Sequence, residues 1–281
     1  MTYAPGPGQE QHRPRIFVAG GSNAVDRPFS FLPMAGWTQA LPLFLHEAVE
    51  VVNCSRARAS SKSFRERGRL QWILDTMRPG DYLLFGFGQT DWKPDPGLHT
   101  EPFSTFLEHM TAYVHGTRER GAHPVILLPY ERRRIDRHGN VARFLGDYPV
   151  AARQLAEDEH VPVVDLYEQS LQWWEELGPE ASKAVFTYLR PGEPLQEHVL
   201  DGDNVHLRAE GAIECARFIA RSMLEQGVIP AHWGRDLDRT RFSYEELGWL
   251  DEETFWHRTK TRVSKMPGAP AGAPANKESG A

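Results

Sequence analysis

Only two cysteines, Cys54 and Cys215, occur among the 281 residues, and they lie far apart without metal-ligand spacing. This scarcity argues against a disulfide framework or a zinc site and favours reduced thiols in a cytoplasmic protein. The sequence also lacks an apolar run of about 20 residues, so no membrane helix is expected. It has no basic surplus, and the net charge of -6 argues against a nucleic-acid partner. The strongest basic run, at 131–134, lies beside acidic residues, and we interpret it as a solvated loop edge.

The two ends of the chain differ in composition from its middle. Residues 1–13 contain no apolar segment typical of a signal peptide, and we interpret them as a flexible leader. Residues 266–281 are rich in Pro, Ala and Gly, which predicts a disordered tail. Residues 14–227 are long enough for one α/β domain. Residues 228–265 mix aromatic and charged side chains, which predicts an extension that packs on the body of the protein or mediates a homodimer.

Short apolar runs alternate with helical patterns through residues 14–227. The runs are mostly bounded by Gly, Pro or Asp and are apolar on both faces, which is typical of a covered parallel sheet. The predicted strands are residues 15–19, 49–53, 82–87, 124–129 and 162–166. The predicted helices are residues 60–77, 104–121, 148–159, 166–178 and 207–227. This alternation predicts a three-layer α/β/α fold with a five-stranded parallel sheet, in which functional sites lie beyond the carboxyl ends of the strands.

Two segments at that predicted edge carry a nucleophile and a base. The Gly-rich turn after the first strand offers Ser22, and the segment before the last helix places Asp203 three residues ahead of His206. A serine hydroxyl needs a base to take its proton, and histidine does this best when a carboxylate fixes its tautomer. An Asp-x-x-His turn brings the carboxylate onto the near ring nitrogen and leaves the far nitrogen free to face the serine. The three residues therefore predict a catalytic triad.

Each of these residues also has an ordinary structural interpretation. Many Gly-rich turns carry serine without any chemical role. Asp203 is equally suited to cap the following helix, with His206 on the surface, and Asp201 competes with it as the orienting carboxylate. Their occurrence at opposite ends of one α/β domain, both at the predicted edge, favours the triad.

The chain resembles the SGNH (GDSL-type) hydrolase superfamily, and within it the rhamnogalacturonan acetylesterases, over about residues 14–227. IFVAGGSNAVD resembles the first sequence block, with Ser22 as nucleophile, and DGDNVHLRAEGA resembles the last, with Asp203 and His206. The segments PMAGW, NCSRARASSKSF and FGQTDW resemble intermediate blocks. This resemblance implies a flavodoxin-like SGNH fold and a serine esterase that needs no metal or organic cofactor.

The resemblance is incomplete around the oxyanion hole that the family uses. The family pattern Gly-Asp-Ser reads Gly-Gly-Ser here, so Gly21 replaces an aspartate that shapes the loop. Arg58 stands where the family has a glycine whose backbone N–H donates to the oxyanion; the N–H is retained, but the glycine geometry is at risk. Loss of one such donor typically lowers the rate by about 10²–10³-fold.

The third block replaces the side-chain donor of that hole. The family pattern Gly-His-Asn-Asp reads Gly-Gln-Thr-Asp at 88–91, so Thr90 occupies the position of the asparagine. The Thr90 hydroxyl and the Gln89 amide are the candidates to replace it. We expect Gln89, Thr90 and Asp91 to line the site, although Asp91 is also suited to cap a turn. Trp37 and Trp92 are predicted either to form a wall on which a sugar ring stacks or to pack in the interior.

These features predict a serine ester hydrolase that deacetylates a small, sugar-containing acyl ester. Ser22 would attack the acyl carbonyl, His206 would take its proton, and Asp203 would orient His206. Two alternatives remain open at this stage. One is an acyltransferase or cyclase of the same fold that modifies a biosynthetic intermediate. The other is a non-catalytic binding module.

Overall fold

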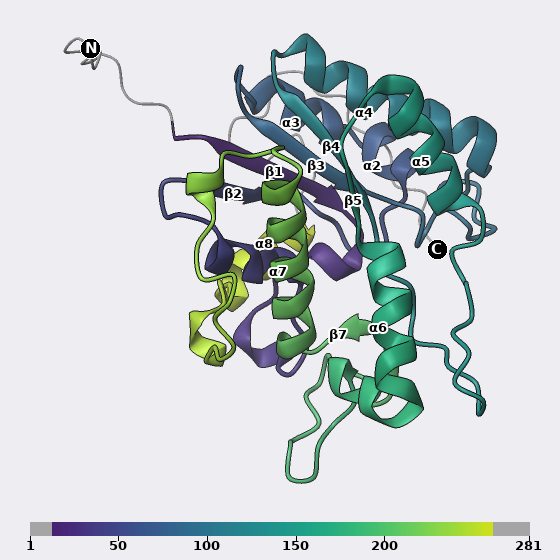
Figure 1. The fold of residues 1–281 in the computed structure, drawn as a ribbon, viewed down its shortest axis with the longest axis vertical. Helices are drawn as coiled ribbons and strands as arrows, with labels where there is room; N and C mark the ends of the chain where they lie inside the picture. Colours follow the sequence, from purple (N-terminus) through teal and green to yellow (C-terminus); the bar gives the residue numbers. More distant parts are fainter. Residues whose placement is uncertain (1–12, 261–281) are drawn as a thin grey trace.

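The structure is a computed structural model that describes residues 13–260. The predicted tail, and the predicted leader apart from its last residue, lie outside the described residues. At the centre is a parallel sheet with the strand order β2-β1-β3-β4-β5 (Figure 1). The strands are β1 (Arg15–Gly20), β2 (Glu50–Asn53), β3 (Tyr82–Gly86), β4 (His123–Leu128) and β5 (Val163–Asp165). All five predicted strands and the α/β class are confirmed.

Helices cover both faces of this sheet, because alternate side chains of each strand point to opposite sides. Ile16 and Val18 of β1 belong to a core shared with α1 and α7, whereas Phe17 and Ala19 belong to a second core shared with α2 to α5. Figure 1 shows α7 on one side of the sheet and α3, α4 and α5 on the other. The helices are α1 (Trp37–Ala40), α2 (Ser61–Glu66), α3 (Arg69–Thr76), α4 (Leu107–Glu119), α5 (Tyr148–Glu159), α6 (Leu166–Ala181), α7 (Ala209–Glu225) and α8 (Glu252–Lys260). The predicted three-layer arrangement is confirmed.

Two predicted helices differ in extent from the observed ones. Residues 60–77 form two helices, α2 and α3, because Gly68 adopts a left-handed conformation with φ of 74° and breaks the helix. Only glycine takes this conformation without a steric cost. The predicted helix at 104–121 begins later, since α4 follows a single wide turn at Pro102–Phe106, and its stop at Gly121 (φ 69°) is confirmed.

The extension after α7 packs on the body of its own chain. Trp233, Phe242, Tyr244 and Trp249 pack against the core that contains α1 and α7, and Phe255 of α8 packs with Phe31 and Met34. Backbone hydrogen bonds join Leu250 N to Arg27 O at 3.0 Å and Gly248 N to Gln39 O at 3.2 Å. The extension is therefore bonded to the segment just after the first strand, and a homodimer through it stays a prediction.

The carboxyl edge of the sheet is completed by a small hairpin. Strands β6 (Phe186–Thr187) and β7 (Asp203–Leu207) pair antiparallel, and β7 lies against the 3₁₀ turn η1 (Ser22–Ala24) that follows β1. Through this packing, residues about 180 positions apart in sequence meet at one edge. Among residues 13–260, no helix combines the length and apolar character needed to cross a bilayer.

Candidate active site

Ser22 occupies the first position of η1, directly beyond the carboxyl end of β1. Its carbonyl accepts hydrogen bonds from Val25 N at 3.4 Å and from the Arg27 guanidinium at 3.0 Å. Neither the hydroxyl nor the backbone N–H of Ser22 is hydrogen-bonded to any residue between 13 and 260. The turn is thus fixed through the Ser22 carbonyl, which leaves the hydroxyl and the N–H available to a ligand.

Arg27 was not singled out from the sequence, although it holds this turn from inside the protein. Its side chain is only 6% exposed and forms no ion pair with a described residue. Burial lowers its pKa to about 10, and the neighbouring charges of Asp203 and Asp26 oppose that shift. The only signal in the sequence is an arginine five residues after the serine, which is too weak to interpret alone.

Asp203 and His206 form the bond that the spacing predicts. His206 Nδ1 lies 2.6 Å from Asp203 Oδ2, while Asp203 Oδ1 accepts the backbone N–H groups of Val205 at 2.7 Å and His206 at 3.2 Å. Burial would raise the pKa of Asp203, but the hydrogen bonds from the His206 ring and the two backbone groups outweigh it and lower the pKa. The carboxylate is therefore ionised near neutral pH and fixes one His206 tautomer, with Nε2 free of hydrogen bonds to the described residues.

The structure brings the three predicted triad residues to one edge without closing the last contact. η1 and β7 are packed together, yet no hydrogen bond joins the Ser22 hydroxyl to His206 within residues 13–260. Catalytic hydrogen bonds are often long in the absence of substrate and shorten in the complex. Asp201 does not compete for His206, because its carboxylate accepts Leu189 N at 2.8 Å instead.

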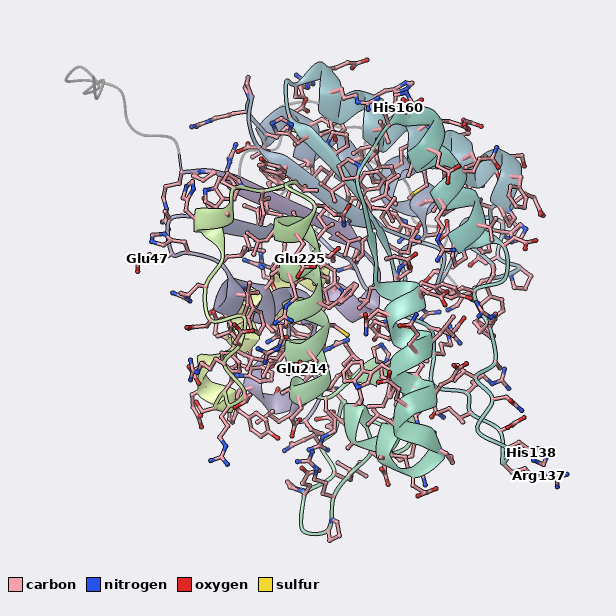
Figure 2. The ribbon with its side chains drawn as sticks, in the orientation of Figure 1. Glu47, Arg137, His138, His160, Glu214 and Glu225 are labelled. Atoms are coloured by element: carbon pink, nitrogen blue, oxygen red, sulfur yellow. The ribbon has the colours of Figure 1, made fainter. Side chains whose placement is uncertain are left out.

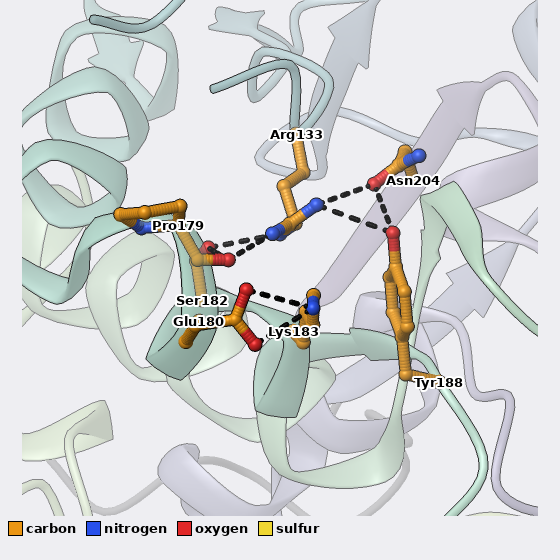
Figure 3. A network of polar contacts seen from close by, with 7 residues as sticks. All are labelled: Arg133, Pro179, Glu180, Ser182, Lys183, Tyr188 and Asn204. Atoms are coloured by element: carbon orange, nitrogen blue, oxygen red, sulfur yellow. Dashed lines mark hydrogen bonds and ion pairs between the residues drawn. The ribbon is translucent and has the colours of Figure 1, made fainter. Parts of the chain in front are cut away.

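A buried arginine anchors the turn that carries Asp203 and His206 (Figure 3). Arg133 donates through its backbone to Asn204 O and through Nη1 to Asn204 Oδ1, both at 2.9 Å. The Tyr188 hydroxyl donates to the same Asn204 Oδ1 at 2.7 Å. The other side of the guanidinium bonds Ser182 Oγ at 2.9 Å and the Pro179 carbonyl. Arg133 therefore links the turn between the two triad residues to the end of α6.

This network corrects the interpretation of residues 131–134 as a solvated loop edge. Glu131 is fully buried, and Arg133 is 8% exposed. The loop leaves the body only further on, where Arg137 and His138 lie at its tip (Figure 2). The run follows a predicted strand at the active edge, and that position was the signal that the sequence interpretation overlooked.

Two further side chains hold the backbone of the same turn. The Tyr130 hydroxyl donates to Val205 O at 2.7 Å, and Thr187 Oγ1 donates to His206 O at 2.7 Å. Burial raises the pKa of Tyr130 well above its usual value, so its hydroxyl keeps the proton that it donates. The turn from Asp203 to His206 is thus held at three consecutive residues by elements outside its own strand.

The predicted oxyanion segment has a left-handed residue at its centre. Arg58 has φ of 62°, a conformation that glycine adopts freely and that strains other residues. Its backbone N–H makes no hydrogen bond with a residue between 13 and 260, as is also true of Ser22. Arg58 therefore has a backbone conformation that glycine adopts freely, with its N–H directed to no described acceptor.

In the segment 88–91, Gln89 and Thr90 lie near the turn that carries Ser22, whereas Asp91 is buried behind them. The Gln89 side-chain amide accepts a hydrogen bond from Asn23 Nδ2 at 2.5 Å and donates one to Tyr130 O at 2.8 Å. Thr90 is 7% exposed, and its hydroxyl makes no hydrogen bond to the described residues. Asp91 is fully buried and accepts Ser61 N, Gly88 N and two hydroxyls. The prediction that Asp91 lines the site is wrong, because its buried carboxylate accepts hydrogen bonds that join its own loop to the start of α2.

The two tryptophans have different positions. Trp37 is 4% exposed and forms part of the wall of a small cavity of about 20 Å³, so it offers no face to a sugar ring. Gly21, Asn23, Ala59 and Gln89 line the same cavity. Trp92 is 36% exposed, and its indole N–H donates to Gln89 O at 2.9 Å. Phe144 meets its ring edge-on, and the Arg132 guanidinium lies 5.6 Å from it.

No group of three or more His, Cys, Asp or Glu side chains in the described range has an arrangement suited to a metal ion. Cys54 and Cys215 are both buried and unpaired, and burial raises the pKa of the Cys54 thiol to about 12. His160, at the end of α5, lies at the opposite end of the molecule from β7 (Figures 1 and 2). The predicted serine, histidine and aspartate lie instead at the carboxyl edge of the sheet.

Comparison with known proteins agrees with this geometry, although no protein-family model matches the chain. The chain is 40% identical to the rhamnogalacturonan acetylesterase RhgT of Bacillus subtilis over 216 residues, which cover 76% of this chain and 91% of that protein. It is 35% identical to the probable rhamnogalacturonan acetylesterase YesY of Bacillus subtilis, covering 76% of this chain and 94% of that protein.

Solved structures show the same fold. The crystal structure of Bacillus subtilis YxiM matches with a TM-score of 0.65 at 26% identity, over 76% of this chain but only 57% of that one. An acetyl-xylooligosaccharide esterase from Geobacillus matches with a TM-score of 0.53 at 14% identity, covering 79% of this chain and 97% of that one. The chain therefore belongs to the SGNH (GDSL-type) hydrolase superfamily, in the rhamnogalacturonan acetylesterase-like group, and is a carboxylic ester hydrolase.

Proposed function

We propose that this esterase removes acetyl groups from a sugar-containing ester through an acyl-enzyme on Ser22. The observation that supports this most directly is the 2.6 Å contact between His206 Nδ1 and Asp203 Oδ2, on a strand packed against the turn that carries Ser22. The names of the relatives, which are acetylesterases acting on rhamnogalacturonan, support the acetyl group and the sugar.

The reaction would proceed in two steps. Ser22 Oγ attacks the acetyl carbonyl carbon, and His206 Nε2 takes the hydroxyl proton while Asp203 stabilises the imidazolium. The tetrahedral intermediate collapses, the C–O bond to the sugar breaks, and His206 returns the proton to the leaving alcohol. Water then attacks the acyl-enzyme with His206 again as base, which releases acetate and restores Ser22.

The developing oxyanion would be stabilised mainly by backbone groups. The N–H groups of Ser22 and Arg58 make no hydrogen bond to the described residues, so both are available as donors. The Thr90 hydroxyl is the third candidate donor. The Gln89 amide is less suited to this role, because its oxygen accepts from Asn23 and its nitrogen donates to Tyr130 O.

The cavity beside the nucleophile turn favours a small acyl group. Its volume of about 20 Å³ has room for about one water-sized group, and Trp37 and Ala59 are among the residues that line it. One extra methylene in a tight pocket typically changes kcat/KM by about 10–200-fold. We therefore expect 4-nitrophenyl acetate to be hydrolysed at least about tenfold faster than the butyrate.

A covalent probe and an activated ester test the proposal together. Ser22→Ala and His206→Ala are expected to lose fluorophosphonate labelling and to lower the hydrolysis of 4-nitrophenyl acetate by about 10⁴-fold or to background. The matched controls are Ser30→Ala, in the next exposed turn, and His160→Ala, at the opposite end of the molecule. Labelling of Ser22→Ala at the wild-type rate would refute the proposed nucleophile.

The same assay separates hydrolysis from acyl transfer. Labelling of Ser22 with slow release of acetate, and faster release when an alcohol is added, would assign the chain to acyl transfer instead. We also propose that the protein acts in the cytoplasm, since Cys54 and Cys215 are both unpaired thiols. Fractionation of the source cells, with the activity assayed in each fraction, tests this location.

A further inference from the structure

Three side-chain hydrogen bonds connect η1, the turn after β1, to strand β7. Asn23 of η1 donates from Nδ2 to Gln89 Oε1 at 2.5 Å, and Gln89 Nε2 donates to Tyr130 O at 2.8 Å. The Tyr130 hydroxyl then donates to Val205 O at 2.7 Å, one residue before His206. The connection therefore runs from the segment of the predicted nucleophile to the segment of the predicted base without passing through the triad itself.

The two ends of the Gln89 amide cannot exchange their partners. The Tyr130 carbonyl can only accept, so the Gln89 nitrogen must face it and the Gln89 oxygen must face Asn23. Asn23 meets that oxygen with its own nitrogen, which leaves Asn23 Oδ1 buried without a hydrogen-bond partner among residues 13–260. Asn23 is only 6% exposed. Within the described range, Gln89 is thus the one residue that hydrogen-bonds the side chain next to Ser22.

The backbone of Gln89 is fixed independently of η1 and β7. Its carbonyl accepts from the Trp92 indole N–H at 2.9 Å. The preceding residue, Gly88, has φ of 120°, and its N–H donates to the buried carboxylate of Asp91 at 2.9 Å. Because the main chain is held on both sides, the Gln89 side chain spans a set distance between its two partners.

Tyr130 is fixed by packing at the other end of that side chain. It lies two residues beyond β4 and is 1% exposed. Its ring meets Phe186 edge-on, with 6.2 Å between the ring centroids, and Phe186 belongs to the strand that pairs with β7. A shift of the Tyr130 main chain therefore moves the hydroxyl that holds Val205.

We propose that Gln89 is a positioning residue, which sets the distance between the turn that carries Ser22 and the turn that carries His206. No hydrogen bond joins the Ser22 hydroxyl to His206 within residues 13–260, so the triad does not set this distance by its own contacts. A displacement of about 1 Å at a reacting group can lower a rate by about 10²-fold, so kcat depends on such a constraint. The inference rests on the catalytic roles proposed above for Ser22 and His206.

Gln89→Met removes both amide hydrogen bonds and keeps an unbranched side chain of similar length. It is expected to lower kcat for 4-nitrophenyl acetate by about tenfold and to leave KM unchanged, because the acyl group is bound as before but the two turns are displaced. The matched control is Gln226→Met, which removes a bond to Val163 O at the start of β5, at the opposite edge of the sheet, and should keep kcat. A raised KM with unchanged kcat in Gln89→Met would overturn the proposal and make Gln89 a wall of the acyl cavity only.

A double-mutant cycle tests whether Gln89 acts through Tyr130. Tyr130→Phe removes only the hydroxyl that bonds Val205. Once either substitution has broken the connection, the other should add little, so each single variant and the double variant should all lose about tenfold in kcat. A loss of about 100-fold in the double variant, the product of two independent effects, would overturn the proposal.

Asn23→Ala is the second variant if Gln89→Met does not fold, since it breaks the same connection at its other end. We expect it to lower kcat by about tenfold and to combine with Tyr130→Phe in the same non-multiplicative manner. Multiplicative losses for this pair would also overturn the proposal.

Hydrogen exchange of residues 203–207 tests the connection without any measurement of activity. The N–H groups of Val205 and His206 are both bonded to Asp203 Oδ1. Gln89→Met is expected to speed their exchange by about tenfold, whereas Gln226→Met should leave it at the wild-type rate. Wild-type exchange in Gln89→Met would overturn the proposal even where Ser22 labels normally. A wild type that fails to label at Ser22 would instead refute the proposed function, and the exchange rates would still decide whether Gln89 holds the two turns together.

Discussion

Asp26 gives the sharpest test of the electrostatics behind the turn that carries Ser22. It lies four residues after Ser22, its side chain is 14% exposed, and it accepts Asn53 Nδ2 at 2.7 Å. Burial raises its pKa from 3.8 to about 6, against the opposing effects of the Asn53 hydrogen bond and the charge of Arg258, whose guanidinium lies 3.6 Å away. The folded state therefore binds the Asp26 proton more tightly than the unfolded state does.

The sign of the effect on stability follows directly. Between pH 3.8 and about 6 the folded protein holds more protons at Asp26 than the unfolded chain, so the free energy of unfolding falls as the pH rises through this window. The rise of the Asp26 pKa from 3.8 to about 6 corresponds to about 3 kcal/mol in total. About 2 kcal/mol of this is lost between pH 4.5 and pH 7.5, because the unfolded carboxyl is already largely ionised at the lower value.

Asp26→Asn removes the titration and keeps an oxygen that accepts from Asn53. Urea unfolding of both proteins at pH 4.5 and at pH 7.5 gives four free energies of unfolding. Subtracting the wild-type value from the variant value at each pH cancels the contributions of all other titrating groups. We expect the variant to gain about 2 kcal/mol relative to the wild type on going from pH 4.5 to pH 7.5. Asp158→Asn, an exposed substitution on α5, is the control, and its free energy of unfolding should change between the two pH values by the same amount as that of the wild type. The same result for Asp26→Asn would refute the inference that burial disfavours the charged form of Asp26.

Three further predictions concern the proposed active site. Arg58→Gly should raise the free energy of unfolding, measured with urea, by about 1 kcal/mol, because glycine adopts the left-handed conformation of residue 58 without strain. Arg58→Ala retains a Cβ in the same conformation and should give no gain. Thr90→Asn should raise kcat for 4-nitrophenyl acetate by about tenfold or more with little change in KM, since it supplies the side-chain donor that the family uses; an unchanged kcat would show that the hole is already complete. Asn204→Ala should lower kcat by about tenfold while KM and the midpoint of unfolding change little, because it releases the Asp203–His206 turn from Arg133 and Tyr188; a proportional loss of folded protein would instead assign Asn204 a purely structural role.

The sequence determined the architecture because the signals for it are local. Apolar runs that end at Gly, Pro or Asp predicted all five strands, and the two periodicities predicted the layers on either side. The pairing of Asp203 with His206 was also predictable, since three residues of a turn fix the distance between the two side chains. Even the stop of α4 at Gly121 was predictable from the glycine alone.

Other properties were decided by contacts between segments distant in sequence. The burial of Asp91 depends on Ser61 and Thr100, and the burial of Arg133 depends on Asn204, Tyr188 and Ser182, none of which is a neighbour in the chain. A charged residue in a loop is normally solvated, so nothing local distinguishes these two from exposed ones.

The same reason applies to Arg58, since only the packed backbone holds this residue at a positive φ. The sequence by itself thus determined the fold and the candidate catalytic residues. The tertiary structure decided which polar groups are already satisfied and which remain free to meet a ligand, because that depends on every segment that packs around them.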